Sequence, residues 1–576
     1  MAELLSRVAS RYPTRVAIRI TNANSNKKYT YADLLSSSSL VSSLLKANLS
    51  LRSSHLNLGN NDSYDGAHDY DSEPMKKRTK KISSCDSKEP SLSPKETTVA
   101  LMAPSGAEYV VGTWATWMAK CVAVPLALSH PPKEIEYVLD DANVSIILAT
   151  SEYSEMLKPL AKARNLDIVL LDLSKEEEQQ QQQQEENNDA QTTQQQQQQQ
   201  QQENDSGALI IYTSGTTGRP KGALHTHGSL IAQVKCLTQA WKWSKDDGIV
   251  HCLPLHHIHG IVNALYCAHY MGACVEFMPR FSPSLIWSRL QRTDPPITVF
   301  MGVPTMYHRL IQAYDAMEDS EQQKASEATK RLRLTISGSA ACPVPIVERW
   351  KEISGSTLLE RYGMTEIGMA LSNPYEGERR AGHVGQPLPG VEVKVVPVEA
   401  NGAEDDDEDD AAPTGRKAAA NESGAGELRV KGPNLFREYW GRPEATADSF
   451  DEDGYFKTGD TVVLDKNYYK ILGRTSVDIL KSGGYKLSAL EIEDHLLEHP
   501  NISEVAVVGL DDVAYGQIVA CVISPGPLTE QELAAWCKGK IAPYKVPRRV
   551  KVVDKIERNA MGKVNKKELV KRYEQL

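Results

Sequence analysis

Near the middle of the chain, an apolar strand runs directly into a loop of glycine and hydroxyl residues. Residues 209–212 form the strand, and residues 213–222 read Thr-Ser-Gly-Thr-Thr-Gly-Arg-Pro-Lys-Gly. Gly215 and Gly218 allow a tight turn that presents backbone N–H groups inward, while the hydroxyls and Lys221 add donors for phosphate oxygens. The loop differs from the GxxxxGK[ST] loop of common NTPases. A plain surface turn is the alternative, but the dense hydroxyl run after an apolar strand favours a phosphate-binding loop.

Short apolar strands alternate with amphipathic helices over most of the chain, a pattern typical of layered α/β proteins. The last hundred or so residues differ, because a helix near 491–497 is followed by strands at 505–509 and 518–523. The sequence therefore predicts an α/β fold. We expect a large N-terminal domain of layered sheets and helices over residues 1–474, and a small, mobile α+β domain over residues 475–576.

Three segments interrupt this pattern, near 48–95, 176–205 and 399–423. The second is rich in glutamine and the third in acidic residues and alanine. None shows hydrophobic periodicity, so we expect disordered insertions. A basic run at 76–81 is either a nuclear signal or, more simply, a solvated charged loop. The net charge of −10 comes largely from the second and third segments, so it gives no reason to expect nucleic-acid binding.

Composition and the chain ends bear on the compartment. Nine cysteines without paired spacing indicate a reducing environment, and no apolar run approaches the roughly 18 residues that a membrane span needs. The N-terminus is rich in arginine, as mitochondrial presequences are. With a strand at 16–20 and a helix soon after residue 29, we expect the domain to begin within about the first ten residues, which would leave no room for a removable leader. We expect a cytoplasmic protein, with a mitochondrial one as the alternative, and a monomer or weak homodimer.

Several further motifs follow in order: Ser337-Gly-Ser, Tyr362-Gly-Met-Thr-Glu, Thr458-Gly-Asp, Gly473-Arg and Asn559-Ala-Met-Gly-Lys. With the loop, they make the chain resemble the adenylate-forming enzymes, which include acyl-CoA synthetases, luciferases and peptide-synthetase adenylation domains. The resemblance covers nearly the whole chain outside the three insertions. It implies that ATP phosphates are held by Thr213, Ser214, Gly215, Thr216, Thr217, Gly218 and Lys221.

The resemblance also implies roles for the later motifs. Thr365 would contact the α-phosphate, and Glu366, with Thr216, would hold Mg²⁺, a hard cation that prefers oxygen ligands. Asp460 would bind both ribose hydroxyls, with help from Arg474. The remaining members of the nucleotide pocket would be Ser337, Gly338 and Tyr362. Each motif alone is weak, since a lone Thr-Gly-Asp is usually a turn and a lone arginine a solvated charge.

Lys563 matches the catalytic lysine of the family, whose ammonium stabilises charge on the carboxylate and α-phosphate. Only the Asn-x-x-Gly-Lys frame separates it from other lysines in a lysine-rich tail, at 545, 551, 555, 566 and 567. The segment around 482–486 resembles the face of the small domain that is used in thioester formation. We place the hinge between the two half-reactions at Ser476, where many relatives carry Asp or Lys.

Arg361 occupies a position where many relatives have glycine. A guanidinium in an acyl pocket is costly to desolvate unless an anion meets it, and a second carboxylate on the substrate would supply that anion. The wider segments around this motif resemble malonyl-CoA synthetases, and Ser339 and His257 would line the acyl site with it. Two alternatives stay open: His257 as a gate or packing residue, and Arg361 paired internally with Glu360 or Glu366.

The sequence thus predicts a malonate–CoA ligase that uses ATP, Mg²⁺ and coenzyme A and acts on small molecules. A synthetase for a medium-chain or aromatic monocarboxylic acid is the runner-up, and Arg361 discriminates against it. An inactive scaffold that binds other proteins is the third possibility. The intact Thr365, Glu366, Asp460, Arg474 and Lys563 speak against it.

Overall fold

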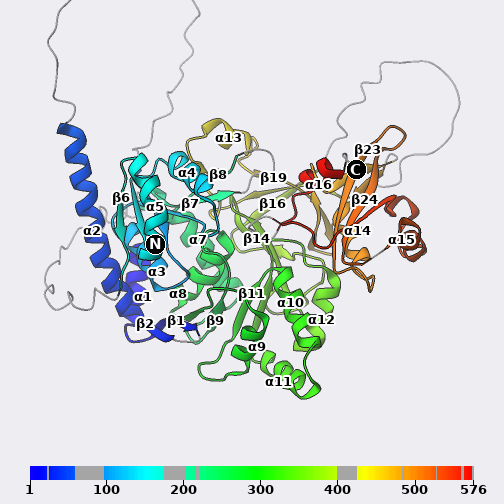
Figure 1. Cartoon of the computed structure of the whole chain (residues 1–576), viewed down its shortest axis with the longest axis horizontal. Coiled ribbons are helices and arrows are strands. Elements are labelled where there is room, and N and C mark those ends of the chain that lie inside the picture. Colours follow the sequence, from blue (N-terminus) through cyan, green and yellow to red (C-terminus); the bar gives the residue numbers. More distant parts are fainter. Residues whose placement is uncertain are drawn as a thin grey trace, which may run out of the picture.

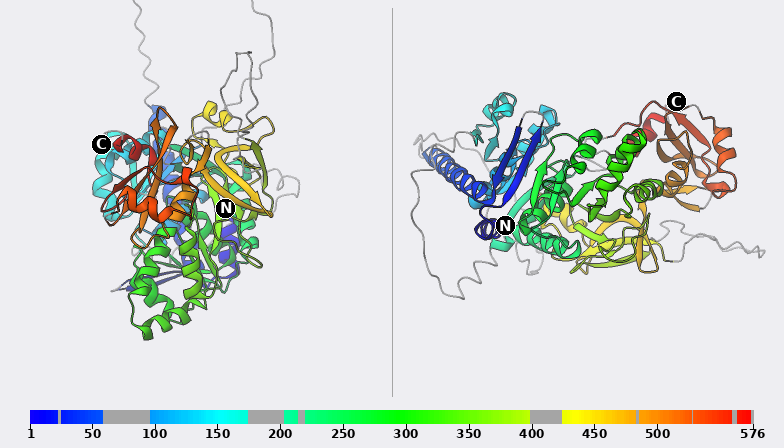
Figure 2. Two further views of the ribbon diagram at one scale, coloured as in Figure 1. Left: turned by 90° about the vertical axis from the view of Figure 1, so that its right-hand side faces the viewer. Right: turned by 90° about the horizontal axis from the view of Figure 1, so that it is seen from below.

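The computed structural model describes residues 1–22, 25–58, 96–173, 203–213, 219–397, 424–482, 485–526, 528–558 and 563–573. A large body built around three sheets occupies most of the molecule, and a small domain lies at one end of it (Figures 1 and 2). This is the predicted α/β fold with a large N-terminal and a small C-terminal domain. The predicted insertion at 399–423 and most of the other two lie outside the described residues.

The largest sheet has nine strands and a parallel centre. Its order is β15 (Gln386–Pro387), β14 (Gly368–Ser372), β13 (Leu359–Met364), β12 (Leu334–Ser337), β11 (Val299–Gly302), β9 (Gly248–His251), β10 (Cys274–Phe277), β1 (Val16–Asn22) and β2 (Ser25–Thr30). The strands from β13 to β1 pair in parallel, whereas β14, β15 and β2 add antiparallel edges. The inner strands are buried along their length, as the apolar runs at 298–301 and 334–337 predict.

The second sheet has seven strands and carries the glycine- and hydroxyl-rich loop. Its order is β18 (Glu438–Tyr439), β8 (Lys221–Thr226), β7 (Gly207–Thr213), β4 (Val122–Pro125), β3 (Thr98–Met102), β5 (Ile146–Ala149) and β6 (Asp167–Leu170). The loop connects β7 to β8, which pair antiparallel. The predicted strand at 209–212 is therefore confirmed as one arm of a hairpin.

A four-stranded antiparallel sheet joins the large body to the small domain. It consists of β16 (Glu392–Pro397), β17 (Gly426–Lys431), β19 (Phe456–Asp465) and β20 (Tyr468–Arg474). The small domain begins directly after β20. Its sheet contains β22 (Tyr485–Ser488), β21 (Ile479–Ser482), β24 (Gly516–Ser524) and β23 (Glu504–Asp512), with β25 (Arg549–Val552) parallel to β24.

Helices cover these sheets, and most of them bury apolar side chains. Those of the large body are α1 (Ala2–Arg11), α2 (Tyr31–Leu58), α3 (Ala107–Met118), α4 (Pro132–Asp141), α5 (Ser151–Ala163), α7 (His227–Ala240), the π-helix η1 (His259–Tyr266), α8 (Cys267–Met271), α9 (Pro283–Gln291), α10 (Pro304–Asp315), α11 (Asp319–Thr329), α12 (Val344–Ser354) and α13 (Pro443–Asp448). The small domain has α14 (Ala489–Leu496), α15 (Glu530–Cys537), the 3₁₀ turn η2 (Pro543–Lys545) and α16 (Lys566–Tyr573).

Helix α2 corrects one predicted boundary. It continues to Leu58, about ten residues into the segment predicted as an insertion near 48–95. Val41 and Leu45 are buried, and Leu49 packs against the same core, so the apolar spacing of a helix persists past residue 48. Residues 203–205 likewise form a helical turn at the end of the second predicted insertion, where Asp205 accepts a hydrogen bond from Arg437 through its backbone oxygen.

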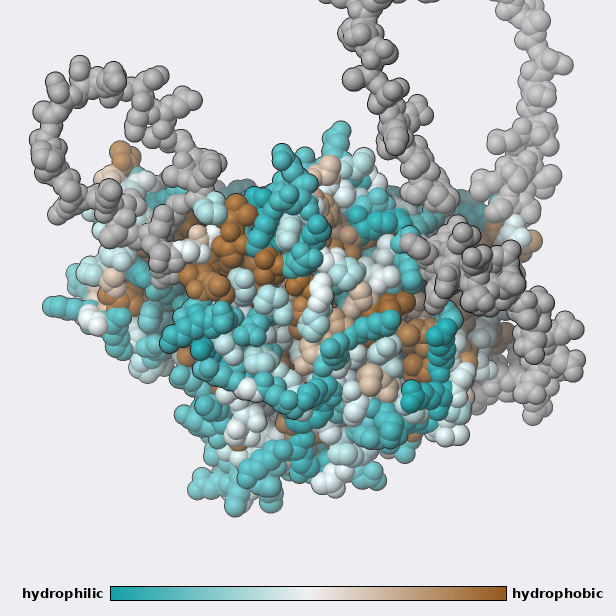
Figure 3. Space-filling view, turned by 180° about the vertical axis from the view of Figure 1, so that it is seen from behind, coloured by the Kyte–Doolittle hydropathy of each residue, from teal (hydrophilic) through white to brown (hydrophobic). Residues whose placement is uncertain are grey.

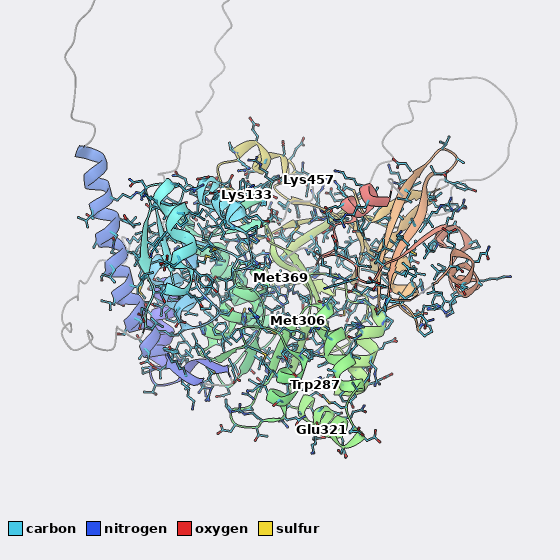
Figure 4. All side chains as sticks on the ribbon, viewed as in Figure 1. Lys133, Trp287, Met306, Glu321, Met369 and Lys457 are labelled. Carbon is cyan, nitrogen blue, oxygen red and sulfur yellow. The ribbon has the colours of Figure 1, made fainter. Side chains whose placement is uncertain are left out.

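Among the described residues, three buried apolar clusters support the large body. In one of them, Trp287 stacks on Trp350 with ring centroids 6.1 Å apart. Figure 4 places Trp287 below Met306 and Met369, which lie near the middle of the molecule. Much of the rear surface is hydrophilic, with apolar patches between charged side chains (Figure 3). Within the described residues, none of the helices is long and apolar enough to cross a membrane.

Candidate active site

The ends of the glycine- and hydroxyl-rich loop are fixed by strand pairing. Thr213 pairs with Lys221 across β7 and β8, and the Thr213 hydroxyl lies 3.4 Å from the Lys221 carbonyl oxygen, to which it donates. The predicted phosphate contacts Ser214, Gly215, Thr216, Thr217 and Gly218 lie outside the described residues. The hairpin therefore fixes where the loop leaves and rejoins the sheet, and it places Lys221 at the site.

Tyr439 connects the loop to the next predicted motif. The Lys221 ammonium lies 4.7 Å from the centroid of the Tyr439 ring, and the Tyr439 hydroxyl donates to Glu366 Oε1 at 2.8 Å. Glu366 is buried. The structure therefore brings Lys221 and Glu366 together through one aromatic residue.

Thr365 is anchored through its backbone. His225 Nε2 donates to the Thr365 carbonyl oxygen at 2.8 Å, and burial lowers the pKa of His225 to about 4, so its ring is neutral near pH 7. This bond spans β8 and the turn after β13, which leaves the Thr365 side chain available to a ligand.

The predicted ribose site is assembled from β13, β19 and β20. The Tyr362 hydroxyl donates to Asp460 Oδ2 at 2.5 Å, and Arg474 Nε lies 3.1 Å from Asp460 Oδ1. Asp460 and Arg474 are direct register partners in the antiparallel pair of β19 and β20. Burial raises the pKa of Asp460, and the neighbouring Arg474 opposes that rise. A carboxylate with a fixed orientation results, as a bidentate contact to two hydroxyls requires.

Arg361 is buried at 4% exposure on β13, and none of the described carboxylates forms an ion pair with it. In the described part of the chain, its Nε and Nη2 atoms have no hydrogen-bond partner. The two glutamates considered as internal partners are engaged elsewhere, because Glu360 Oε1 accepts from Gly382 N at 2.9 Å and Glu366 binds Tyr439. Burial lowers the pKa of Arg361 to about 9. Such a group strongly favours an anion beside it.

Gly338 makes room for this guanidinium. A Cβ atom at position 338 would lie 2.4 Å from Arg361 Cζ, so a larger residue could not share the space. Ser337 ends β12 beside Glu360, and its buried hydroxyl is without a partner among the described residues. Gly338 therefore lies against the predicted acyl site, in addition to the nucleotide role that the resemblance assigns to it.

Three further side chains line the space near Arg361. His259 Nδ1 lies 3.1 Å from the Ser339 hydroxyl, and its Nε2 atom is buried without a partner in the described part of the chain. Burial, reinforced by the charge of Arg361, lowers the pKa of His259 well below its ordinary value. His257 is also neutral near pH 7, since burial and the nearby Lys563 lower its pKa to about 4. The site therefore offers neutral imidazoles beside one cation.

Lys563 reaches the same site from the small domain. Its side chain keeps access to solvent, yet the surrounding protein and the charge of Arg474 lower its pKa, while Asp460 and Glu366 oppose this shift. The structure therefore gathers the predicted catalytic, nucleotide and acyl residues of both domains around one space. The exceptions are the loop residues 214–218, which lie outside the described residues.

The chemistry of the donors fits one Mg²⁺ ion held mainly by substrate. Glu366 supplies a buried carboxylate oxygen, and no group of three or more His, Cys, Asp or Glu side chains suited to a metal occurs among the described residues. Mg²⁺ is commonly bound through one or two carboxylates plus substrate phosphates. Thr216, the second predicted ligand, lies outside the described residues.

Sequence reasoning missed Tyr439, His225 and His259. Tyr439 and His225 lie outside the matched motifs, and their roles depend on contacts between distant strands. His259 had a signal, because it stands two residues after His257 in the run Leu255-His-His-Ile-His-Gly260. Its place at the start of a π-helix, a feature frequent at functional sites, puts it opposite Ser339.

Comparison with known proteins identifies the class. Residues 93–440 match the AMP-binding enzyme family, and residues 491–563 match the C-terminal domain of AMP-binding enzymes. The chain belongs to this family.

Similar proteins within this family indicate the group to which the chain is most alike. A malonate–CoA ligase of Arabidopsis thaliana is 45% identical over 498 residues, which cover 83% of this chain and 78% of the relative. The human mitochondrial malonate–CoA ligase ACSF3 is 45% identical over 499 residues, 83% of each chain. The crystal structure of ATP-bound MatB from Rhodopseudomonas palustris superimposes with a TM-score of 0.76 at 28% identity and covers 99% of both chains.

Proposed function

We propose that this protein is a malonate–CoA ligase. It joins malonate to AMP with release of pyrophosphate, then transfers the malonyl group to coenzyme A with release of AMP. The relatives named above share close to half of the sequence with this chain over most of its length. Family membership supports the reaction class, and the site supports the choice of acid.

The single observation that supports malonate as the substrate is the buried guanidinium of Arg361, whose charge no described residue neutralises. A monocarboxylic acid would place a neutral alkyl or aromatic group beside this cation and leave its cost of burial uncompensated. Malonate places its second carboxylate there, within reach of Nε and Nη2 for paired hydrogen bonds. The reacting carboxylate then points back toward Lys563 and the nucleotide.

In the first half-reaction, a malonate oxygen attacks the α-phosphorus of ATP, a new O–P bond forms, and pyrophosphate departs. Asp460 and Arg474 hold the ribose, and Thr365 holds the α-phosphate. Lys563 offsets the negative charge that builds up between the carboxylate and the α-phosphate. Bound Mg²⁺, held at Glu366 and Thr216, would neutralise charge on the departing pyrophosphate.

In the second half-reaction, the thiol of coenzyme A attacks the malonyl carbonyl carbon, its proton passes to solvent, and AMP departs. The small domain must move for the thiol to reach that carbon. We place the moving unit at residues 475–576 and its hinge at Ser476, within the turn that follows β20. The large unit is then residues 1–474.

Cytoplasmic placement and a monomer or weak homodimer remain our expectations. The alternative is a mitochondrial protein, and it is supported by the human relative, which is described as mitochondrial. Imaging of a C-terminally tagged chain against a mitochondrial marker separates the two compartments, and light scattering at several concentrations measures the oligomeric state.

Release of AMP from ATP across a panel of acids tests the function. Purified protein is incubated with ATP, Mg²⁺ and coenzyme A, together with malonate, methylmalonate, succinate, acetate, octanoate or coumarate. Preference for malonate that depends on coenzyme A is the expected result. Preference for a monocarboxylic acid would keep the ligase class and refute the substrate, whereas no turnover with any acid would favour the inactive scaffold.

A further inference from the structure

Lys566 forms buried ion pairs with two carboxylates, Asp478 and Glu493, at the edge of the small domain. It is the first residue of α16, and its ammonium lies 2.6 Å from Asp478 Oδ1 and 2.6 Å from Glu493 Oε1. The side chain of Lys566 is 10% exposed, and those of the two acids are 15% exposed. Helix α16 lies beside β23 on the side that faces the large domain (Figure 1). Lys566 is one of the lysines of the lysine-rich tail, and its burial distinguishes it from its exposed neighbour Lys567.

Asp478 belongs to the connection between the domains. Its Oδ2 atom accepts from the Arg474 backbone N–H at 3.0 Å, and its own N–H donates to the Arg474 carbonyl oxygen at 2.8 Å. Gly473 has a φ of +124°, and a Cβ atom there would lie 2.3 Å from Asp478 Cβ. Hydrogen bonds between Arg474 and Asp478 therefore stabilise this turn, and Lys566 forms an ion pair with Asp478 at its end.

Glu493 supplies a rigid second anchor. It lies on α14, and its carboxylate also accepts from the Val507 backbone N–H at 2.7 Å. Burial alone would lower the pKa of Lys566, but Glu493 and Asp478 outweigh burial and raise it. The cation is therefore firmly held between two carboxylates. Without it, these two acids would face each other uncompensated.

This ion pair fixes the segment that carries Lys563. Lys566 follows Lys563 by three residues, so their Cα atoms are at most about 11 Å apart. Val564 and Leu569 pack against the small apolar cluster around Ile556, which holds the same segment on the domain. The position of Lys563 beside Asp460 and Glu366 depends on this docking.

We propose that Lys566 is a positioning residue for adenylation. Together with Asp478 and Glu493, it holds the tail so that the Lys563 ammonium lies over the nucleotide site, and it does so in the hinge arrangement seen here. The inference rests on the proposed function for its substrate, but its logic applies to whichever acid the enzyme activates. The ammonium of Lys566 pairs with Asp478 and Glu493, so we assign it a role through placement of the tail.

Separate measurement of the half-reactions tests the proposal. Adenylation is followed by acid-dependent exchange of labelled pyrophosphate into ATP. Thioester formation is followed by consumption of separately prepared acyl-adenylate with coenzyme A. Lys566→Met is expected to slow exchange by about 10- to 100-fold, as misplacement by about 1 Å can do, and to change thioester formation by less than about threefold. Lys566→Arg should restore most of the exchange, and Lys567→Met, at the exposed neighbour, should match the wild type.

A double variant shows whether Lys566 acts through Lys563. Lys563→Met alone should slow exchange by at least about 100-fold, and adding Lys566→Met should slow it little further. Multiplied effects, or equal loss of both half-reactions in Lys566→Met, would overturn the proposal. If Lys566→Met does not fold, Glu493→Gln is measured instead, with about tenfold slower exchange expected. Should the wild type exchange with another acid rather than malonate, the substrate proposal fails, and the variants are compared with that acid.

Discussion

Replacement of Arg361 by methionine should separate substrate binding from stability. Methionine retains much of the volume and removes the charge. The loss of one partner from a buried, hydrogen-bonded ion pair costs about 3–5 kcal/mol, so kcat/KM for malonate should fall by roughly 100- to 3,000-fold. The KM for ATP should change little, because the ribose and phosphate contacts come from Asp460, Arg474 and Lys221.

Stability of the same variant should change in the opposite direction. A pKa lowered to about 9 corresponds to roughly 5 kcal/mol against the charged guanidinium, an upper bound on its cost in the ligand-free protein. Arg361→Met should therefore melt at a higher temperature than the wild type without ligand, and malonate should no longer raise its melting point. Arg349→Met removes a half-exposed arginine that pairs with Asp315 and Glu352, and this control should leave the kinetics unchanged.

The assays are steady-state AMP release with malonate or ATP varied, and thermal unfolding with and without malonate. Equal losses toward ATP and malonate would refute the selection of malonate by Arg361. A variant that is less stable than the wild type without ligand would show that the guanidinium is not an uncompensated charge.

Three further outcomes follow from the geometry. Gly338→Ala places a Cβ atom 2.4 Å from Arg361 Cζ, so kcat/KM for malonate should fall at least about tenfold. An unchanged kcat/KM in steady-state kinetics would contradict the close packing of these two residues. Tyr362→Phe removes the hydrogen bond to Asp460 and should raise the KM for ATP about tenfold, whereas a selective effect on malonate would contradict the ribose site. Burial raises the pKa of Glu360 to about 8, so the folded protein holds a proton that the unfolded chain releases near its ordinary value. Unfolding free energy should therefore fall as pH rises from about 5 to 8, and Glu360→Gln should reduce that fall by up to about 4 kcal/mol in urea titrations; identical slopes would contradict the raised pKa.

Helices and strands that depend on local sequence patterns could be predicted from the sequence. The strand at residues 209–212, the helix near 491–497 and the separate C-terminal unit all follow from hydrophobic periodicity and turn residues. The end of α2 could not be placed, because serine and asparagine after residue 48 are also typical of loops, and packing against α3 extends the helix.

The residues of the candidate site also differ in how far the sequence could predict them. Motif order predicts Asp460, Arg474 and Lys563 as site residues, and the structure places them near one another. Contacts between distant strands are invisible in a single sequence. The bond from Tyr439 to Glu366 spans 73 positions, and the ion pair from Lys566 to Asp478 spans 88. Arg361 is an intermediate case. Its residue type indicates an anionic partner, but only the structure shows that its Nε and Nη2 atoms have no hydrogen-bond partner among the described residues.

The most direct test compares malonate with butyrate in the wild-type enzyme. The two acids are similar in size, and butyrate carries an uncharged ethyl group where malonate carries the second carboxylate that Arg361 is proposed to bind. We predict that kcat/KM for malonate exceeds that for butyrate by at least about 100-fold, the lower limit set by one buried charge-assisted contact. Equal or higher efficiency with butyrate would contradict selection of a dicarboxylic acid by the buried guanidinium.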